Sequence, residues 1–136
     1  MSVYVDTSAF LAIMDVADIN HDRAKRAWDE LVASEEELIA SNYVIVETFA
    51  LAQRRLGLGA VASFEENVYP ALEIHWVDEP THDAGVAAVL AAFRRNLGLV
   101  DCVSFAVMRR AEIRKAFSFD PHFKEQGFEI VPGPPG

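Results

Sequence analysis

The stretch that decides the fold of this protein reads Val3-Tyr4-Val5-Asp6-Thr7-Ser8-Ala9-Phe10. The apolar run at residues 2–5 predicts a strand, and the Asp-Thr-Ser that follows is typical of the start of a helix. This helix is expected to continue to residue 14. A short apolar strand that leads directly into a helix is the repeating unit of a parallel α/β sheet.

The same alternation of short strands and helices continues along the chain. Further strands are expected at residues 38–40, 73–77, 116–119 and 128–131. Further helices are expected at residues 21–33, 43–56, 60–68, 82–96 and 102–114, and Asn20, Thr81 and Asp101 are expected to begin three of them. This order predicts a three-layer α/β/α fold around a central parallel sheet of about five short strands. We expect one domain over residues 1–131 and a disordered tail over Pro132–Gly136.

The composition fits one compact domain, because 51% of the 136 residues are hydrophobic and 24% are charged. The single cysteine, Cys102, excludes an intrachain disulfide and favours a reducing cytoplasm. Apolar stretches such as Val86–Phe93 are shorter than the roughly 20 residues needed to span a bilayer. Asp6 interrupts the first apolar run, which argues against a signal peptide. A cytoplasmic protein without a membrane partner is therefore expected.

The net charge is −9, from 12 Lys and Arg against 21 Asp and Glu. A surface of this sign does not coat nucleic acid non-specifically, because the phosphate backbone attracts basic surfaces. Local arginine clusters and bound metal ions can still hold a polyanion. Each short basic run is interpreted first as a solvated helix face: Arg54–Arg55, Arg94–Arg95, and Arg109–Arg110 with Arg114–Lys115.

Four carboxylates stand out as candidates for chemistry. Asp6 follows the first strand, Asp101 begins a helix, and Asp120 follows the fourth strand. Ligands of a parallel sheet bind beyond the carboxyl ends of its strands, so these acidic residues are candidates for a binding site. Glu47 lies within a helix among apolar neighbours, where burying a carboxylate is costly unless a cation or strong donors meet it.

Each of these carboxylates also has a purely structural interpretation. Asp6 and Asp101 could cap the helices that follow them, and Asp120 could be an ordinary turn residue. Glu47 could lie on a solvent-facing stripe of its helix. Taken together, the four favour one shared site. Clustered carboxylates need a counter-ion, hard divalent cations prefer oxygen ligands, and two such ions about 3.5–4 Å apart suit attack of water on a phosphodiester.

Four segments resemble, in order and spacing, the signature blocks of the PIN-domain family: Val3–Phe10, Asn42–Thr48, Leu99–Ala106 and Phe117–Phe123. The resemblance covers Val3 to Val131 and is closest to the toxin ribonucleases of the VapC type. It implies an endoribonuclease that depends on Mg²⁺ or Mn²⁺. It also implies that Asp6 and Asp101 are metal ligands, and that Glu47 and Asp120 complete the catalytic acidic set, directly or through water.

The resemblance further implies partners: an RNA substrate, a small antitoxin protein and a second copy of the chain in a homodimer. The hydroxyls of Thr7, Ser8 and Ser104 match polar positions of the family. Ser104 comes three residues after Asp101 and so shares its helix face. It could orient a carboxylate or water, or simply bond a backbone carbonyl.

Three further residues are weaker candidates. His122, two residues after Asp120, could touch substrate or metal, whereas the other three histidines are expected in surface or core positions. Cys102 is expected to be a buried thiol, because the neighbouring anion of Asp101 raises its pKa and argues against a nucleophile. Arg54 shares a helix face with Glu47, so it either contacts a substrate phosphate or is solvated.

Rival functions remain at this point. An aspartyl-phosphate phosphatase is disfavoured, because Ser8 stands where haloacid-dehalogenase-like enzymes carry a second aspartate. A response-regulator receiver would place its phospho-acceptor after a middle strand, where this chain has Ser41-Asn42. The non-enzymatic alternative is a PIN-like module that binds RNA or protein without cutting it, and a metal-binding titration would discriminate between the two.

Overall fold

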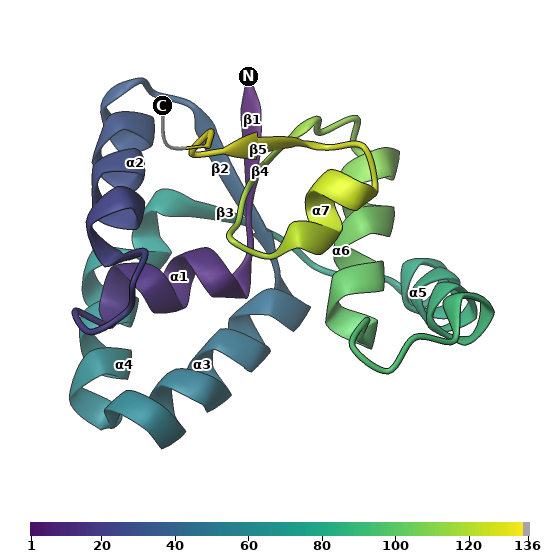
Figure 1. Cartoon of the computed structure of the whole chain (residues 1–136), viewed down its shortest axis with the longest axis horizontal. Coiled ribbons are helices and arrows are strands. Elements are labelled where there is room, and N and C mark those ends of the chain that lie inside the picture. The colour runs from purple at the N-terminus through teal and green to yellow at the C-terminus, as the bar shows by residue number, and fades with distance from the viewer. Residues whose placement is uncertain (135–136) are drawn as a thin grey trace.

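The computed structural model describes residues 1–134 and contains one parallel sheet with helices on both faces (Figure 1). Its five strands are β1 (Ser2–Val5), β2 (Glu37–Ser41), β3 (Leu72–His75), β4 (Lys115–Phe117) and β5 (Glu129–Val131). They lie in the order β3-β2-β1-β4-β5, and every neighbouring pair is parallel. The predicted three-layer α/β/α architecture with a five-stranded parallel sheet is confirmed.

Two groups of helices enclose this sheet. The α-helices are α1 (Thr7–Met14), α2 (His21–Ala33), α3 (Asn42–Leu56), α4 (Leu58–Asn67), α5 (Glu79–Ala92), α6 (Leu99–Arg110) and α7 (Pro121–Glu125), with a 3₁₀ turn, η1, at Tyr69–Ala71. Figure 1 shows α1, α2 and α4 on one side of the sheet and α5, α6 and α7 on the other. The helix α3 leaves the end of β2 and packs against α1, α4 and α6.

The core is built around β1, the central strand. Val3, Tyr4 and Val5 are completely buried, as expected for a parallel strand that is covered on both faces. The Tyr4 hydroxyl is satisfied inside the core by the hydroxyls of Ser41 at 3.1 Å and Ser104 at 2.8 Å. A fully buried, fully paired central strand fixes the position of the residue that follows it, Asp6.

Several helix boundaries differ from those expected. The cap of α5 is Asp78, whose carboxylate accepts the Thr81 N–H at 2.9 Å, so Thr81 lies within the helix instead of beginning it. This helix ends at Ala92, and not at residue 96, because Phe93 adopts a left-handed conformation with φ of 52°. Asn20 precedes α2 but makes no side-chain capping hydrogen bond.

The helix that carries Asp101 is also shifted. It begins at Leu99, so Asp101 is the third helical residue and does not begin the helix. It ends at Arg110, and not at residue 114, because Glu112 takes a left-handed conformation with φ of 57°. The Ile113 N–H then bonds the Met108 carbonyl at 2.8 Å, which closes the helix end.

The expected turn at Asp120-Pro121 is wrong, because a short helix, α7, begins there. The Asp120 carboxylate accepts the His122 N–H at 2.9 Å, and Pro121 occupies the first helical position, where a missing N–H costs nothing. This helix is too short to show an apolar periodicity, so only its capping residues could have revealed it.

The end of the chain is described only in part. Pro132–Pro134 follow β5 without regular secondary structure, and the Gly133 carbonyl accepts a hydrogen bond from Arg23 at 2.8 Å. Residues 135–136 lie outside the described part of the chain, so the disordered tail and the domain boundary at residue 131 stay predictions. Within residues 1–134, no helix is both long and apolar enough to cross a bilayer.

Candidate active site

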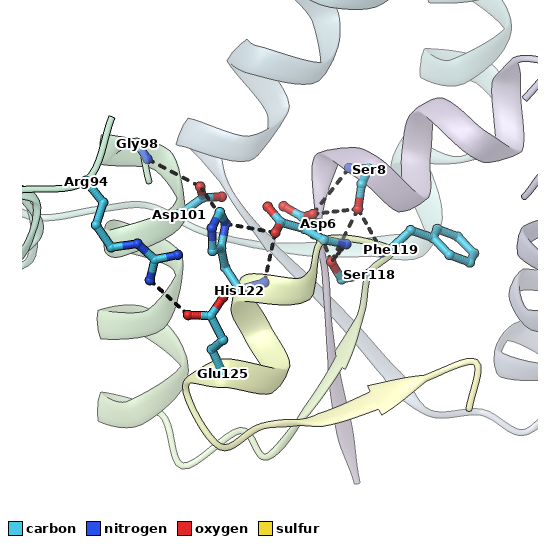
Figure 2. Close-up of polar contacts among 10 residues, drawn as sticks. Asp6, Ser8, Arg94, Gly98, Asp101, Ser118, Phe119, His122 and Glu125 are labelled. Atoms are coloured by element: carbon cyan, nitrogen blue, oxygen red, sulfur yellow. Dashed lines mark hydrogen bonds and ion pairs between the residues drawn. The ribbon is translucent and has the colours of Figure 1, made fainter. Parts of the chain in front are cut away.

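Asp6 stands directly after β1 and caps α1 (Figure 2). Its Oδ2 accepts three hydrogen bonds: from the Ser8 hydroxyl at 2.7 Å, the Ser8 N–H at 3.3 Å and the Ser118 hydroxyl at 3.1 Å. The residue is only 4% exposed. Burial raises the pKa of Asp6, the bonds from Ser8 and Ser118 oppose this, and the charge of Asp120 raises it further. The structural interpretation of Asp6 as a cap is therefore correct, and it does not conflict with a place in the site.

Asp120 lies beside Asp6 because the chain leaves β4 next to the point where it leaves β1. Ser118 connects the Asp6 carboxylate to the backbone of Asp120: its hydroxyl donates to Asp6 and accepts the Asp120 N–H at 2.9 Å. The Ser8 hydroxyl in turn accepts the Phe119 N–H at 2.9 Å. The hydroxyls of Ser8 and Ser118 thus hold the two strand ends together. The sequence analysis did not single out Ser118 as a candidate residue.

Asp101 approaches the same point from α6. Its Oδ2 accepts the Gly98 N–H at 3.4 Å, and the side chain is 19% exposed. Burial raises the pKa of Asp101 to about 6, and the charges of Asp120, Asp6 and Glu47 add to this effect. A carboxyl whose pKa is raised by three other carboxylates lies in a field that a cation would relieve.

Glu47 comes from α3 and is half-buried. On its helix, Val44 and Thr48 are buried while Val46 is 67% exposed, so Glu47 lies at the boundary between the two faces. Burial raises the pKa of Glu47, the Thr7 hydroxyl opposes this, and the charges of Asp6 and Asp120 raise it again. All four predicted carboxylates therefore lie near enough to act on one another, which the sequence alone could not establish.

His122 joins this cluster more closely than the sequence indicated. Its Nδ1 lies 2.9 Å from Asp120 Oδ1 and 4.0 Å from Asp101 Oδ2. One donor atom from each of Asp101, Asp120 and His122 lies within 4.8 Å of the others. Figure 2 shows the His122 ring beside Asp101. The only sequence signal for this was the position of His122 two residues after an acidic helix cap.

Other predicted polar residues take supporting positions. Ser104 neither orients a carboxylate nor bonds a backbone carbonyl in the described hydrogen bonds, because its hydroxyl pairs with Tyr4 at 2.8 Å. The Thr7 hydroxyl bonds the Thr48 hydroxyl at 3.0 Å and so ties α1 to α3. Cys102 is buried, and burial together with the charge of Asp101 raises its pKa, as expected for an unreactive thiol.

The donor set of the cluster suits a divalent cation. Carboxylate oxygens are the ligands that Mg²⁺ and Mn²⁺ prefer. In residues 1–134 no lysine or arginine forms an ion pair with Asp6, Glu47, Asp101 or Asp120, so His122 is the one basic side chain paired with this cluster in that part of the chain. The pKa values of Asp6, Glu47 and Asp101 are raised first by burial and then by the charges of the neighbouring carboxylates.

The family model for the PIN domain matches residues 3–129, and the chain belongs to this family. It is 32% identical over 130 residues to the 23S rRNA-specific endonuclease VapC20 of Mycobacterium tuberculosis, over 95% of this chain and 97% of that protein. The sequence-based prediction of a PIN-domain ribonuclease resembling VapC-type toxins is confirmed.

Solved structures agree with this assignment. The crystal structure of Mycobacterium tuberculosis VapC20, named as a toxin that cleaves the sarcin–ricin loop, matches with a TM-score of 0.81 and 32% identity, over 93% of this chain and 96% of that one. FitAcB from Neisseria gonorrhoeae matches with a TM-score of 0.69 and 14% identity, over 94% of this chain and 95% of that one. At that lower identity the likeness concerns the fold alone.

Proposed function

We propose that this protein is a metal-dependent endoribonuclease and the toxin of a toxin–antitoxin pair. The observation that carries the proposal is the convergence of Asp6, Glu47, Asp101 and Asp120 at the carboxyl end of the sheet, in a chain similar over 95% of its length to VapC20. An acidic protein can act on a polyanion in this way only where a cation offsets the carboxylates.

In this proposal the four carboxylates are both the metal ligands and the catalytic set. Bound Mg²⁺ or Mn²⁺ supplies an activated water and stabilises charge at the departing oxygen. Asp6 is the most rigidly held ligand, because three hydrogen bonds fix its Oδ2. Ser118 positions Asp6 and Asp120 relative to each other. Asp101 and Glu47 bring the remaining negative charge from two helices on different sides of the site.

The substrate to test first is the sarcin–ricin loop of 23S rRNA. The similarity to VapC20, a protein named for cleaving that loop, is the reason for this choice. The purified chain would be incubated with an RNA hairpin of this loop, a hairpin with a scrambled loop, and a single-stranded RNA. We expect cleavage of the first in Mg²⁺ or Mn²⁺ and no cleavage in excess EDTA.

Two variants complete the experiment. Asp6→Asn and Asp101→Asn each remove one charge while keeping a side chain of the same shape, so we expect loss of cleavage with an intact circular-dichroism spectrum. Full activity in EDTA would exclude the metal-dependent mechanism. Divalent-ion and RNA binding without cleavage of any RNA would instead support the non-cutting PIN module.

The toxin role adds partners. We infer that a small antitoxin protein covers the acidic site and presents a basic side chain to the carboxylates, because arginine pairs strongly with such groups. A homodimer and a cytoplasmic location complete the proposal. Expression of the chain alone should slow growth, Asp6→Asn should relieve it, and harmless wild-type protein at the same level would contradict the toxin role.

A further inference from the structure

His122 carries an unusual buried nitrogen. The side chain is only 10% exposed, and its Nδ1 has no hydrogen-bond partner in residues 1–134. The oxygen Asp120 Oδ1 lies 2.9 Å away, but the two atoms are not aligned for a hydrogen bond. A buried polar atom without a partner is costly and is retained where something outside the protein chain meets it.

The surroundings of this nitrogen indicate what meets it. It faces two carboxylates, Asp120 at 2.9 Å and Asp101 at 4.0 Å. Adjacent ligand atoms of an octahedral ion lie about 3 Å apart and opposite ones about 4.2 Å apart when bond lengths are about 2.1 Å. The two separations measured from Nδ1 are close to these two values, and all three donor atoms lie within 4.8 Å of one another.

We propose that His122 is a metal ligand through Nδ1, and that Asp101, Asp120 and His122 form a mixed nitrogen–oxygen site. This inference rests on the metal-binding part of the proposed function and adds a ligand and a selectivity to it. Imidazole nitrogen binds transition ions better than it binds Mg²⁺, which prefers oxygen alone. The site therefore selects Mn²⁺, and more strongly Co²⁺, over Mg²⁺.

The first measurement uses the wild-type chain and no RNA. Purified, EDTA-treated protein is loaded with substoichiometric Mn²⁺ and examined by electron–nuclear double resonance. A directly bound imidazole gives a ¹⁴N coupling that changes to that of ¹⁵N in protein grown with ¹⁵N-histidine. Bound Mn²⁺ without any histidine nitrogen coupling would overturn the proposal and would favour an ion pair between His122 and Asp120 instead.

The second measurement assigns the nitrogen by substitution. His122→Asn places an amide near the position of Nδ1, so it offers an oxygen where the wild type offers a nitrogen. Titration calorimetry should show Mn²⁺ affinity lower by about 10–100-fold and Mg²⁺ affinity changed by less than about 3-fold. His75→Asn, at an exposed position on β3, is the matched control and should change neither affinity.

The outcomes separate this inference from the function on which it rests. No binding of Mn²⁺ or Mg²⁺ by the wild type would overturn both proposals. Ion binding with nitrogen coupling but no RNA cleavage would support His122 as a ligand and contradict the proposed nuclease activity. An equal loss of Mn²⁺ and Mg²⁺ affinity in a folded His122→Asn would overturn the selectivity. If that variant does not fold, substitution of His21, His75 and His82 must leave the nitrogen coupling unchanged, and its loss in any of them would contradict the assignment.

Discussion

The two ends of the same parallel sheet differ in how their charged residues are arranged. At the carboxyl end, where β1 and β4 finish, Asp6, Asp101 and Asp120 lie close together, and in the described structure none of them pairs with a lysine or arginine. At the amino end, acidic and basic residues alternate around a hollow of about 440 Å³ that is lined by Met1, Ser2, Glu112, Arg114, Lys115 and Glu129. Lysine and arginine accompany the carboxylates at the amino end, whereas no lysine or arginine in residues 1–134 pairs with those at the carboxyl end.

The shape of the surface alone would suggest the amino end instead. A second hollow near the amino end, of about 710 Å³, lies between the end of α6 and β5 and includes Arg109, Glu112 and Phe128. One of its two arginines is already engaged, since Arg109 bonds the Gln126 side chain at 2.7 Å and lies over the Phe128 ring at 5.2 Å. Unneutralised charge, and not volume, distinguishes the site, in line with the rule that parallel sheets bind ligands at their carboxyl ends.

The largest expected effect is the difference between a variant that removes one charge at the carboxyl end and a variant that removes one charge at the amino end. Asp101→Asn should lower RNA cleavage by at least about 100-fold, because even residues that only support a metal ligand are worth about 10–100-fold. Glu129→Gln, at the amino end, should leave the rate constant unchanged. Single-turnover cleavage of the sarcin–ricin hairpin measures both, and similar losses in the two variants would contradict the distinction between the ends.

A smaller effect is expected from the hydroxyl that joins Asp6 and Asp120. Ser118→Ala removes the donor to Asp6 and leaves the Asp120 N–H without its acceptor. We expect Mn²⁺ affinity to fall by about 10-fold and the free energy of unfolding to fall by about 1–2 kcal/mol. Titration calorimetry measures the Mn²⁺ affinity, and urea unfolding measures the free energy of unfolding.

Ser104→Ala is the control for this prediction. It removes a buried hydrogen bond to Tyr4, and its hydroxyl bonds none of the four carboxylates, so stability should fall while metal affinity stays the same. If both variants change metal affinity equally, Ser118 has no special positioning role.

The charge crowding at the carboxyl end also predicts a pH dependence without metal. Burial and three neighbouring carboxylates raise the pKa of Asp101 from 3.8 to about 6 in the folded chain. Between these values the folded state holds a proton that the unfolded chain has released, so the free energy of unfolding falls as pH rises from about 4 to about 6. After screening by solvent, this contribution should amount to about 1–2 kcal/mol.

The comparison that isolates this contribution is between wild type and Asp101→Asn in EDTA. The variant should gain stability relative to wild type as pH rises through this window, and added Mn²⁺ should reduce the difference by stabilising the wild type. Thermal unfolding at pH 4, 5, 6 and 7 measures it. A difference that does not change with pH would mean that Asp101 is not in the crowded field described above.

The strands and the acidic set could be predicted from sequence because they follow from local rules. An apolar run followed by Asp predicts both a strand end and a helix cap, and in a parallel sheet these caps gather at one end. The structural and the functional interpretations of Asp6 were therefore not alternatives, since Asp6 caps α1 and faces the candidate site, whereas Asp120, expected to be a turn residue, caps α7.

The remaining features depend on contacts between distant segments. The position of His122 opposite Asp101 requires α7 to pack beside α6, and no local pattern encodes that separation. The role of Ser118 likewise arises from the pairing of β4 with β1, which brings residues 112 positions apart within 3.1 Å. The ends of α5 and α6 were missed because Phe93 and Glu112, which follow them, take the left-handed conformation although neither is a glycine.

The smallest expected effect concerns a positive charge on the same helix face as Glu47. Arg54 lies seven residues further along α3, hence on the same face and about 10 Å away at about 1.5 Å per residue, and it is exposed. In residues 1–134 it forms no ion pair, so its charge is available to a phosphate one or two nucleotides from the cleaved bond.

Arg54→Ala should then raise KM by a few-fold for all RNAs, leave kcat unchanged, and lower the slope of binding against salt by about one unit. Arg26→Ala, an exposed arginine on α2, controls for net charge, and an unchanged KM and salt slope in Arg54→Ala would make Arg54 an ordinary solvated residue.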